Sequence, residues 1–196
     1  MGLTLTTLAV FIGVAFVNAL LVPHKWREWV LFVLSVVFVY SLQPDIFVRW
    51  LDFIFPTLTL GLIVLCWFIT RTSEQSITRE DGIALAVVVV ITISLSLFRY
   101  ISIDYDWLLA SRPPPLWLVG VLMGLFGTLI AISGTRKQSL FLLLLGIIAV
   151  FIVLKTEFFA VSVSAWMRNF VSQDVSQAQA TDLNWLGFSY VAFRLL

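Results

Sequence analysis

Residues 53–70 read FIFPTLTLGLIVLCWFIT, an apolar run of 18 positions that contains no charged side chain. As a helix, a run of this length nearly matches the roughly 30 Å hydrocarbon core of a bilayer. Across all 196 residues, 61% are hydrophobic and only 12% are charged, whereas a soluble domain carries about 25% charged residues. The composition therefore predicts an all-α membrane protein rather than a soluble domain.

Further apolar runs lie on both sides of this one, separated by turns rich in proline, glycine or charge. They predict six transmembrane helices within residues 1–154, at residues 3–22, 29–42, 53–70, 82–98, 116–133 and 139–154. The first run lacks a basic leader and an A-x-A cleavage site, so we interpret it as a retained span rather than a signal peptide.

The segment after the sixth run has a different pattern. Its bulky apolar residues recur at i, i+4, i+7, i+8 and i+11, namely Phe159, Val163, Trp166, Met167 and Phe170. Ser164 and Arg168 fall on another face. One apolar and one polar face predict an amphipathic helix at the membrane surface, followed by a polar loop, together covering residues 155–182.

Residues 183–196 begin what we interpret as a partial seventh span. As a helix they would measure about 21 Å, which is shorter than the bilayer core. Backbone carbonyls that end inside lipid need protein cover. We therefore expect either another protein chain or a C-terminal continuation to pack there.

The distribution of basic residues predicts the orientation. The turns after the first, third and fifth runs carry two each: Lys25 and Arg27, Arg71 and Arg79, Arg136 and Lys137. The turns after the second and fourth runs carry three in all, Arg49, Arg99 and Arg112, and the N-terminus carries none. Basic loops favour the cytoplasm, so the N-terminus is expected outside. The formal net charge of +1 gives no electrostatic case for nucleic acid.

The sequence offers little for catalysis or metal binding. His24 is the only histidine and lies between a proline and a lysine, where we expect a solvated side chain. Cys66 is the only cysteine, so one histidine and one cysteine cannot supply a zinc ligand set. We therefore predict no catalytic residue and no metal ligand in this chain.

Several residues are candidates for contact with a partner chain. Gly120, Gly124 and Gly127 form a small-residue stripe on the fifth run, which permits close helix approach either within the chain or to a partner. The complete set of candidate contacts is Gly120, Gly124, Gly127, Phe159, Trp166, Phe170, Trp185 and Phe193.

Four ordered segments resemble the N-terminal part of bacterial membrane-bound O-acyltransferases (MBOAT), in the branch that includes alginate- and D-alanine-transferring members. Residues 23–40 resemble that family's "P…WR" followed by "L…S…FY", and residues 51–57 resemble an N-terminal segment found in related members. LKTEFF at residues 154–159 resembles "KY..FF", which begins a re-entrant or surface helix. LNWLGFSYVAFR at residues 183–194 resembles "LGISFYTFQ".

The resemblance implies an enzyme that moves an acyl group from a thioester donor to a hydroxyl, in a bacterial inner or thylakoid-type membrane. The essential histidine of the family lies well beyond the last of these motifs, so this chain alone is expected to be inactive and to hold no cofactor. The alternative is a non-catalytic helical subunit of a larger photosynthetic or respiratory membrane complex.

Overall fold

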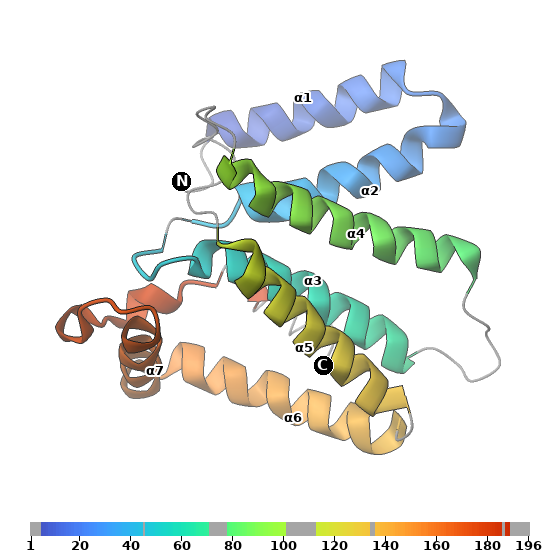
Figure 1. The fold of residues 1–196 in the computed structure, drawn as a ribbon. Coiled ribbons are helices and arrows are strands. Elements are labelled where there is room, and N and C mark those ends of the chain that lie inside the picture. The colour runs from blue at the N-terminus through green and yellow to red at the C-terminus, as the bar shows by residue number, and fades with distance from the viewer. Residues whose placement is uncertain are drawn as a thin grey trace.

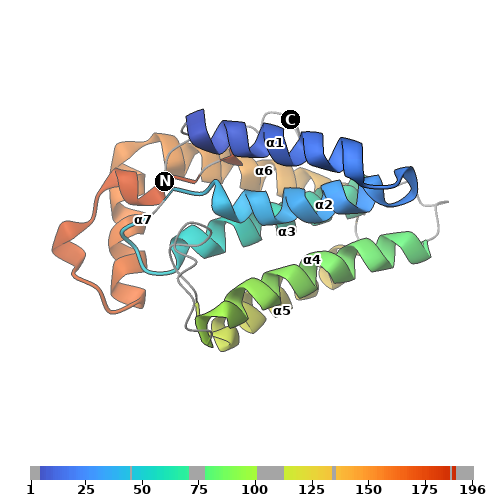
Figure 2. The same cartoon turned by 90° about the horizontal axis from the view of Figure 1, so that it is seen from above.

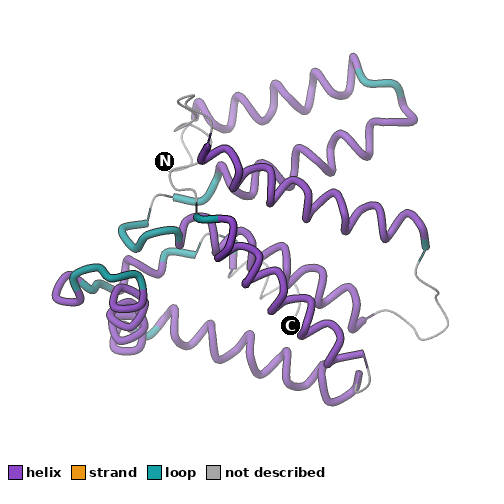
Figure 3. The backbone as a smooth tube through the Cα atoms, viewed as in Figure 1, coloured by secondary structure: helices purple, strands orange, loops and turns teal. Residues whose placement is uncertain are grey.

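A computed structural model describes residues 5–44, 46–70, 78–100, 113–133, 136–185 and 187–188. All regular secondary structure in these ranges is helical, which confirms the all-α prediction (Figure 3). The α-helices are α1 (Leu5–Leu21), α2 (His24–Ser41), α3 (Leu51–Thr70), α4 (Arg79–Leu97), α5 (Pro115–Ser133), α6 (Arg136–Lys155) and α7 (Glu157–Phe170). The short 3-10 helices are η1 (Phe98–Tyr100), η2 (Val175–Gln177) and η3 (Ala180–Leu183).

Helices α1 to α6 lie lengthwise, consecutive helices run in opposite directions, and α7 crosses one end of the bundle (Figure 1). Helix α3 contacts α2, α4, α5 and α6. Figure 2 shows α4 and α5 side by side on the face away from α1. Helix α3 is therefore the centre of the bundle.

Buried hydroxyl groups join three of these helices. The Tyr40 hydroxyl of α2 lies 3.0 Å from the hydroxyls of both Thr57 on α3 and Thr92 on α4. Each threonine hydroxyl can also donate to a carbonyl of its own helix. Each hydroxyl has a single proton, so Tyr40 donates to one threonine, and the other threonine donates either to Tyr40 or to the carbonyl of its own helix.

One glycine brings two helices together, and it lies outside the predicted stripe. A Cβ atom added to Gly61 on α3 would lie 2.6 Å from Leu125 Cδ1 on α5. The same addition at Gly120, Gly124 or Gly127 would meet nothing within 4 Å. The close approach of α3 and α5 therefore depends on Gly61, and the stripe on α5 is open.

The number of candidate membrane spans is smaller than predicted. Among the described residues, α3 and α4 are long and apolar enough to cross a membrane, and α6 with α7 would give a third if that bent pair counts as one span. The six-span prediction is therefore wrong for the described part of the chain. The apolar parts described for α1 and α5 are Ala9–Leu21 and Pro115–Thr128, which are short for a span. The beginning of α2 carries three charged residues, Lys25, Arg27 and Glu28.

Two helix starts also differ from the predictions. Residues 24–28 were expected to form a polar turn, but they are the first turn of α2, because Pro23 suits the position just before a helix. Helix α3 begins at Leu51 rather than 53, which moves Pro56 from the first turn into the second. Of the predicted seventh span, residues 186 and 189–196 lie outside the described part, and Leu183 belongs to η3.

Candidate functional site

The most highly organised polar site lies where α7 crosses the end of the bundle. Helix α6 ends at Lys155, Thr156 adopts an extended conformation (φ −101°, ψ 113°), and α7 leaves at 95° to the described part of α6. Hydrogen bonding continues through the bend, because the Thr156 amide donates to the Ile152 carbonyl and the Thr156 carbonyl accepts from the Ala160 amide. The bend is therefore a defined corner of the fold.

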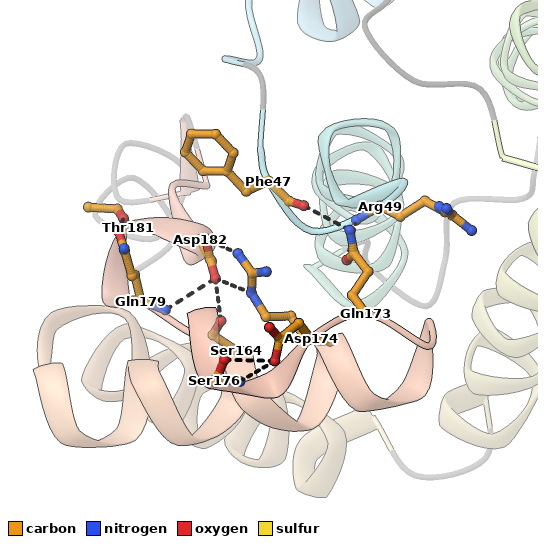
Figure 4. A network of polar contacts seen from close by, with 10 residues as sticks. Phe47, Arg49, Ser164, Gln173, Asp174, Ser176, Gln179, Thr181 and Asp182 are labelled. Atoms are coloured by element: carbon orange, nitrogen blue, oxygen red, sulfur yellow. Dashed lines mark hydrogen bonds and ion pairs between the residues drawn. The ribbon is translucent and has the colours of Figure 1, made fainter.

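An ion pair attaches the segment after α7 to the helix itself. Arg168 Nε lies 2.7 Å from Asp182 Oδ2, and Arg168 Nη2 donates to Asp182 Oδ1 over 3.1 Å (Figure 4). The Ser164 hydroxyl also donates to Oδ2 over 2.6 Å, and the backbone amide of Gln179 donates to the same oxygen over 3.2 Å. Arg168 is 5% exposed and Asp182 1%. A buried ion pair needs this many hydrogen bonds to offset its desolvation.

Burial on its own would raise the pKa of the Asp182 carboxyl. The hydrogen bonds from Arg168, Ser164 and the Gln179 amide, together with the charge of Arg168, outweigh that effect and hold the pKa below its usual value. Asp182 is therefore ionised at neutral pH, and the pair with Arg168 is fully charged.

A second contact attaches the same segment to the start of α3. The Gln173 side-chain amide donates to the Phe47 carbonyl over 3.1 Å, and its oxygen accepts from the Arg49 amide over 3.0 Å (Figure 4). The next residue, Trp50, has a φ of 67°, which is uncommon for a bulky side chain. Gln173 thus holds the backbone just before this strained position. We call residues 157–185, held by these contacts, the α7 cap.

The predicted faces of α7 are present in part, because Val163 and Met167 of the apolar face pack inside the chain. Ser164 and Arg168, on the polar face, are buried. Trp166 and Phe170, on the apolar face, are 63% and 58% exposed. The helix therefore buries Ser164 and Arg168, while its outer face carries aromatic rings together with the polar Ser162 and Asn169.

An apolar groove of about 510 Å³ lies beside the cap, between α3, α5 and α6. Its wall includes Leu62, Leu125, Leu143, Trp185 and Phe188, and none of the described residues that line it carries a charge. Trp185 stacks on Phe55 with ring centroids 4.8 Å apart and donates its indole N–H to the Thr59 hydroxyl over 2.8 Å. The end of the α7 cap thus closes one side of the groove.

The candidate partner contacts fall into separate places. The three stripe glycines are exposed on α5, and Phe159, Trp166 and Phe170 are exposed on α7. Trp185 packs within its own chain, half-buried, and Phe193 lies outside the described residues. Their role in binding a partner stays a prediction.

The residues considered for chemistry also lie apart. His24 is exposed at the start of α2, and Cys66 is buried in α3. Within the described ranges, no group of three or more His, Cys, Asp or Glu side chains could hold a metal ion.

The sequence pattern placed Asp182 only in a polar loop and did not indicate that it pairs with Arg168. Its spacing from Gln179 gave only a weak signal, because a capping box usually begins with serine or threonine rather than glutamine. The structure contains that box at η3. The spacing indicates a turn, but it does not indicate which helix the turn packs against.

Comparison of the chain with known protein families, with curated proteins and with solved structures finds no match. Function must therefore be argued from the residues and the geometry.

Proposed function

We propose that this chain is a membrane-embedded helical scaffold of an O-acyltransferase, and that the catalytic histidine lies on polypeptide outside residues 1–196. The observation that carries the proposal is the corner at Thr156. It falls inside the LKTEFF segment, where the resemblance to the MBOAT family implies that a re-entrant or surface helix begins. This agreement supports the proposal because helix geometry played no part in the resemblance.

The groove between α3, α5 and α6 gives the scaffold a role. An uncharged wall of leucine, tryptophan and phenylalanine side chains suits the alkyl part of an acyl thioester. In the proposed reaction, the oxygen of an acceptor hydroxyl attacks the thioester carbonyl, the C–S bond breaks, and the thiol leaves. The hydroxyl proton goes to a general base. His24 is exposed at the α2 turn and does not line this groove, so the base is assigned to other polypeptide.

Crosslinking and turnover together test the proposal. Residues 1–196, purified in detergent, are incubated with an acyl thioester that carries a photoreactive group in its chain. We expect crosslinks at Leu62 or Leu143 in the groove, and none at Leu20, which is exposed on α1 away from it. We also expect no acyl transfer to a hydroxyl acceptor. Turnover by residues 1–196 alone, or crosslinks spread equally over both sites, would contradict the proposal.

The open glycine stripe favours a second candidate, a non-catalytic subunit of a larger membrane complex. Gly120, Gly124 and Gly127 have no neighbour within 4 Å of an added Cβ, which leaves room for a partner helix. Purification from native membranes in a mild detergent separates the two candidates. Co-migration with pigment-binding or redox proteins supports the subunit, whereas co-migration with a histidine-bearing acyltransferase half counts against it.

A further inference from the structure

A continuous series of rings runs across the end of the bundle where α7 lies. The Arg49 guanidinium lies 5.8 Å from the Trp50 ring centroid, and Trp50 lies 5.9 Å from Trp117. Trp117 meets Phe170 edge-on at 5.2 Å, and Phe170 stacks on Trp166 at 5.8 Å. We call these five residues the aromatic ladder. Its members come from three segments that are distant in sequence.

The ladder lies at the level where helices of the bundle begin. Trp50 directly precedes α3, which is long and apolar enough to cross a membrane, and Trp117 is in the first turn of α5. The other two rings belong to α7, which crosses the bundle at this end (Figures 1 and 2). If α3 crosses a bilayer, the ladder therefore lies at one of its two surfaces, with α7 roughly in the plane of that surface.

The burial pattern of α7 identifies the solvent that its outer face meets. Trp166 and Phe170 are exposed together with Glu157 and Asn169, while Ser164 and Arg168 are buried and paired. In water this arrangement is unfavourable, because it exposes apolar area and desolvates charge. Next to lipid it is favourable, since charged groups in membrane proteins turn inward and pair with one another.

We propose that the outer face of α7 and the aromatic ladder dock in the headgroup and glycerol layer of a phospholipid bilayer. Tryptophan is enriched in this layer because its ring is apolar while its N–H can bond to lipid or water. Arg49 is exposed at the end of the ladder, where its guanidinium can stay among the headgroups. The Arg168–Asp182 pair holds α7 crosswise, so the ladder sets the depth of the bundle in the bilayer.

Depth-dependent quenching tests this docking. In a Cys66→Ala background, Trp166→Cys is labelled with a fluorescent probe and reconstituted into phosphatidylcholine–phosphatidylglycerol vesicles. These vesicles contain lipids with a nitroxide either near the glycerol or near the methyl end of the acyl chain. We expect at least twofold stronger quenching by the shallow nitroxide than by the deep one. Phe170→Cys, on the same face, gives a second measurement if the first variant folds poorly.

Two matched positions calibrate the result. Leu145 is exposed along α6, and a probe at Leu145→Cys should respond more to the deep nitroxide. Val175 is exposed in η2, and a probe at Val175→Cys should respond mainly to aqueous iodide. Stronger quenching by the deep nitroxide at both α7 sites would overturn the proposal. So would quenching by iodide alone, or protection from every quencher, which would indicate a protein partner. None of these results depends on acyl transfer, so this docking and the proposed function can fail separately.

Discussion

Asp182 has the densest set of contacts among the polar residues described. It accepts hydrogen bonds from Arg168, Ser164 and the Gln179 amide, and it is almost completely buried. Removing one member of a buried ion pair is costly because the remaining charge loses its partner while it stays desolvated. Asp182 is therefore the single residue on which the position of α7 depends most.

We predict that Asp182→Ala destabilises the α7 cap by roughly 3–5 kcal/mol, the usual cost of leaving a buried charge unpaired. Reversible unfolding in mixed micelles, followed by circular dichroism and by limited proteolysis of residues 171–182, measures the effect. Asp174→Ala is the matched control, since Asp174 is exposed and accepts only from Ser176. Equal stability of the two variants would show that the buried pair does not hold the cap.

The same carboxyl predicts a dependence on acidic pH. The pKa of Asp182 lies below its value of 3.8 in an unfolded chain, so its contribution to stability is fully present above that pH. The contribution is lost as the pH falls through the folded-state pKa. We therefore expect proteolysis of residues 171–182 by an acid-active protease to accelerate only below about pH 3.8. A cap that loosens already between pH 5 and 7 would contradict the assignment; Asp182→Ala should lack the acid-dependent step.

At the scale of helices, close packing depends on where small residues face. The glycines of α5 at positions 120, 124 and 127 have the spacing of a helix contact, yet they face open space. Gly61 of α3, which belongs to no glycine motif, meets Leu125. The spacing of glycines thus indicates that a second helix could approach closely. The packing of the bundle determines whether a second helix lies there.

We predict that Gly61→Leu destabilises the bundle by about 1–3 kcal/mol, because the added side chain overpacks the contact with Leu125 on α5. Gly124→Leu is the matched control and should be neutral or slightly stabilising, since leucine favours helix more than glycine does. Thermal unfolding in detergent by circular dichroism compares the two variants. A destabilised Gly124→Leu with an unaffected Gly61→Leu would reverse the assignment of the two positions.

For the whole molecule, the α7 cap and the start of α4 lie at opposite ends of the bundle (Figure 1). Basic residues are more frequent in the turns at the α4 end, which predicts that this end faces the cytoplasm. The cap, the aromatic ladder and the expected N-terminus would then face the other side.

We therefore predict that a membrane-impermeant maleimide added to intact cells labels Val175→Cys and leaves Glu80→Cys unlabelled, both in a Cys66→Ala background. Both positions are exposed, so access should depend only on the side of the membrane. Inverted vesicles should give the opposite result. Labelling of Glu80→Cys from outside, with Val175→Cys protected, would reverse the predicted orientation.

Local sequence patterns alone predict the helical class, the approximate helix boundaries and the start of a different helix after Lys155. These features depend on hydropathy, proline and short periods, which act between residues close together in the chain. The sequence predicted six spans, whereas the described residues contain two or three candidates, because the apolar parts described for α1 and α5 are short. Packing between distant segments sets the pairing of Arg168 with Asp182, the contact of Gln173 with residues 47–49, the close helix contact at Gly61, and the joining of three segments in one aromatic ladder. Periodicity shows that a helix has an apolar face and a polar face. Which segment packs against each face depends on contacts between residues far apart in the chain, such as Arg49 and Gln173, which are 124 positions apart.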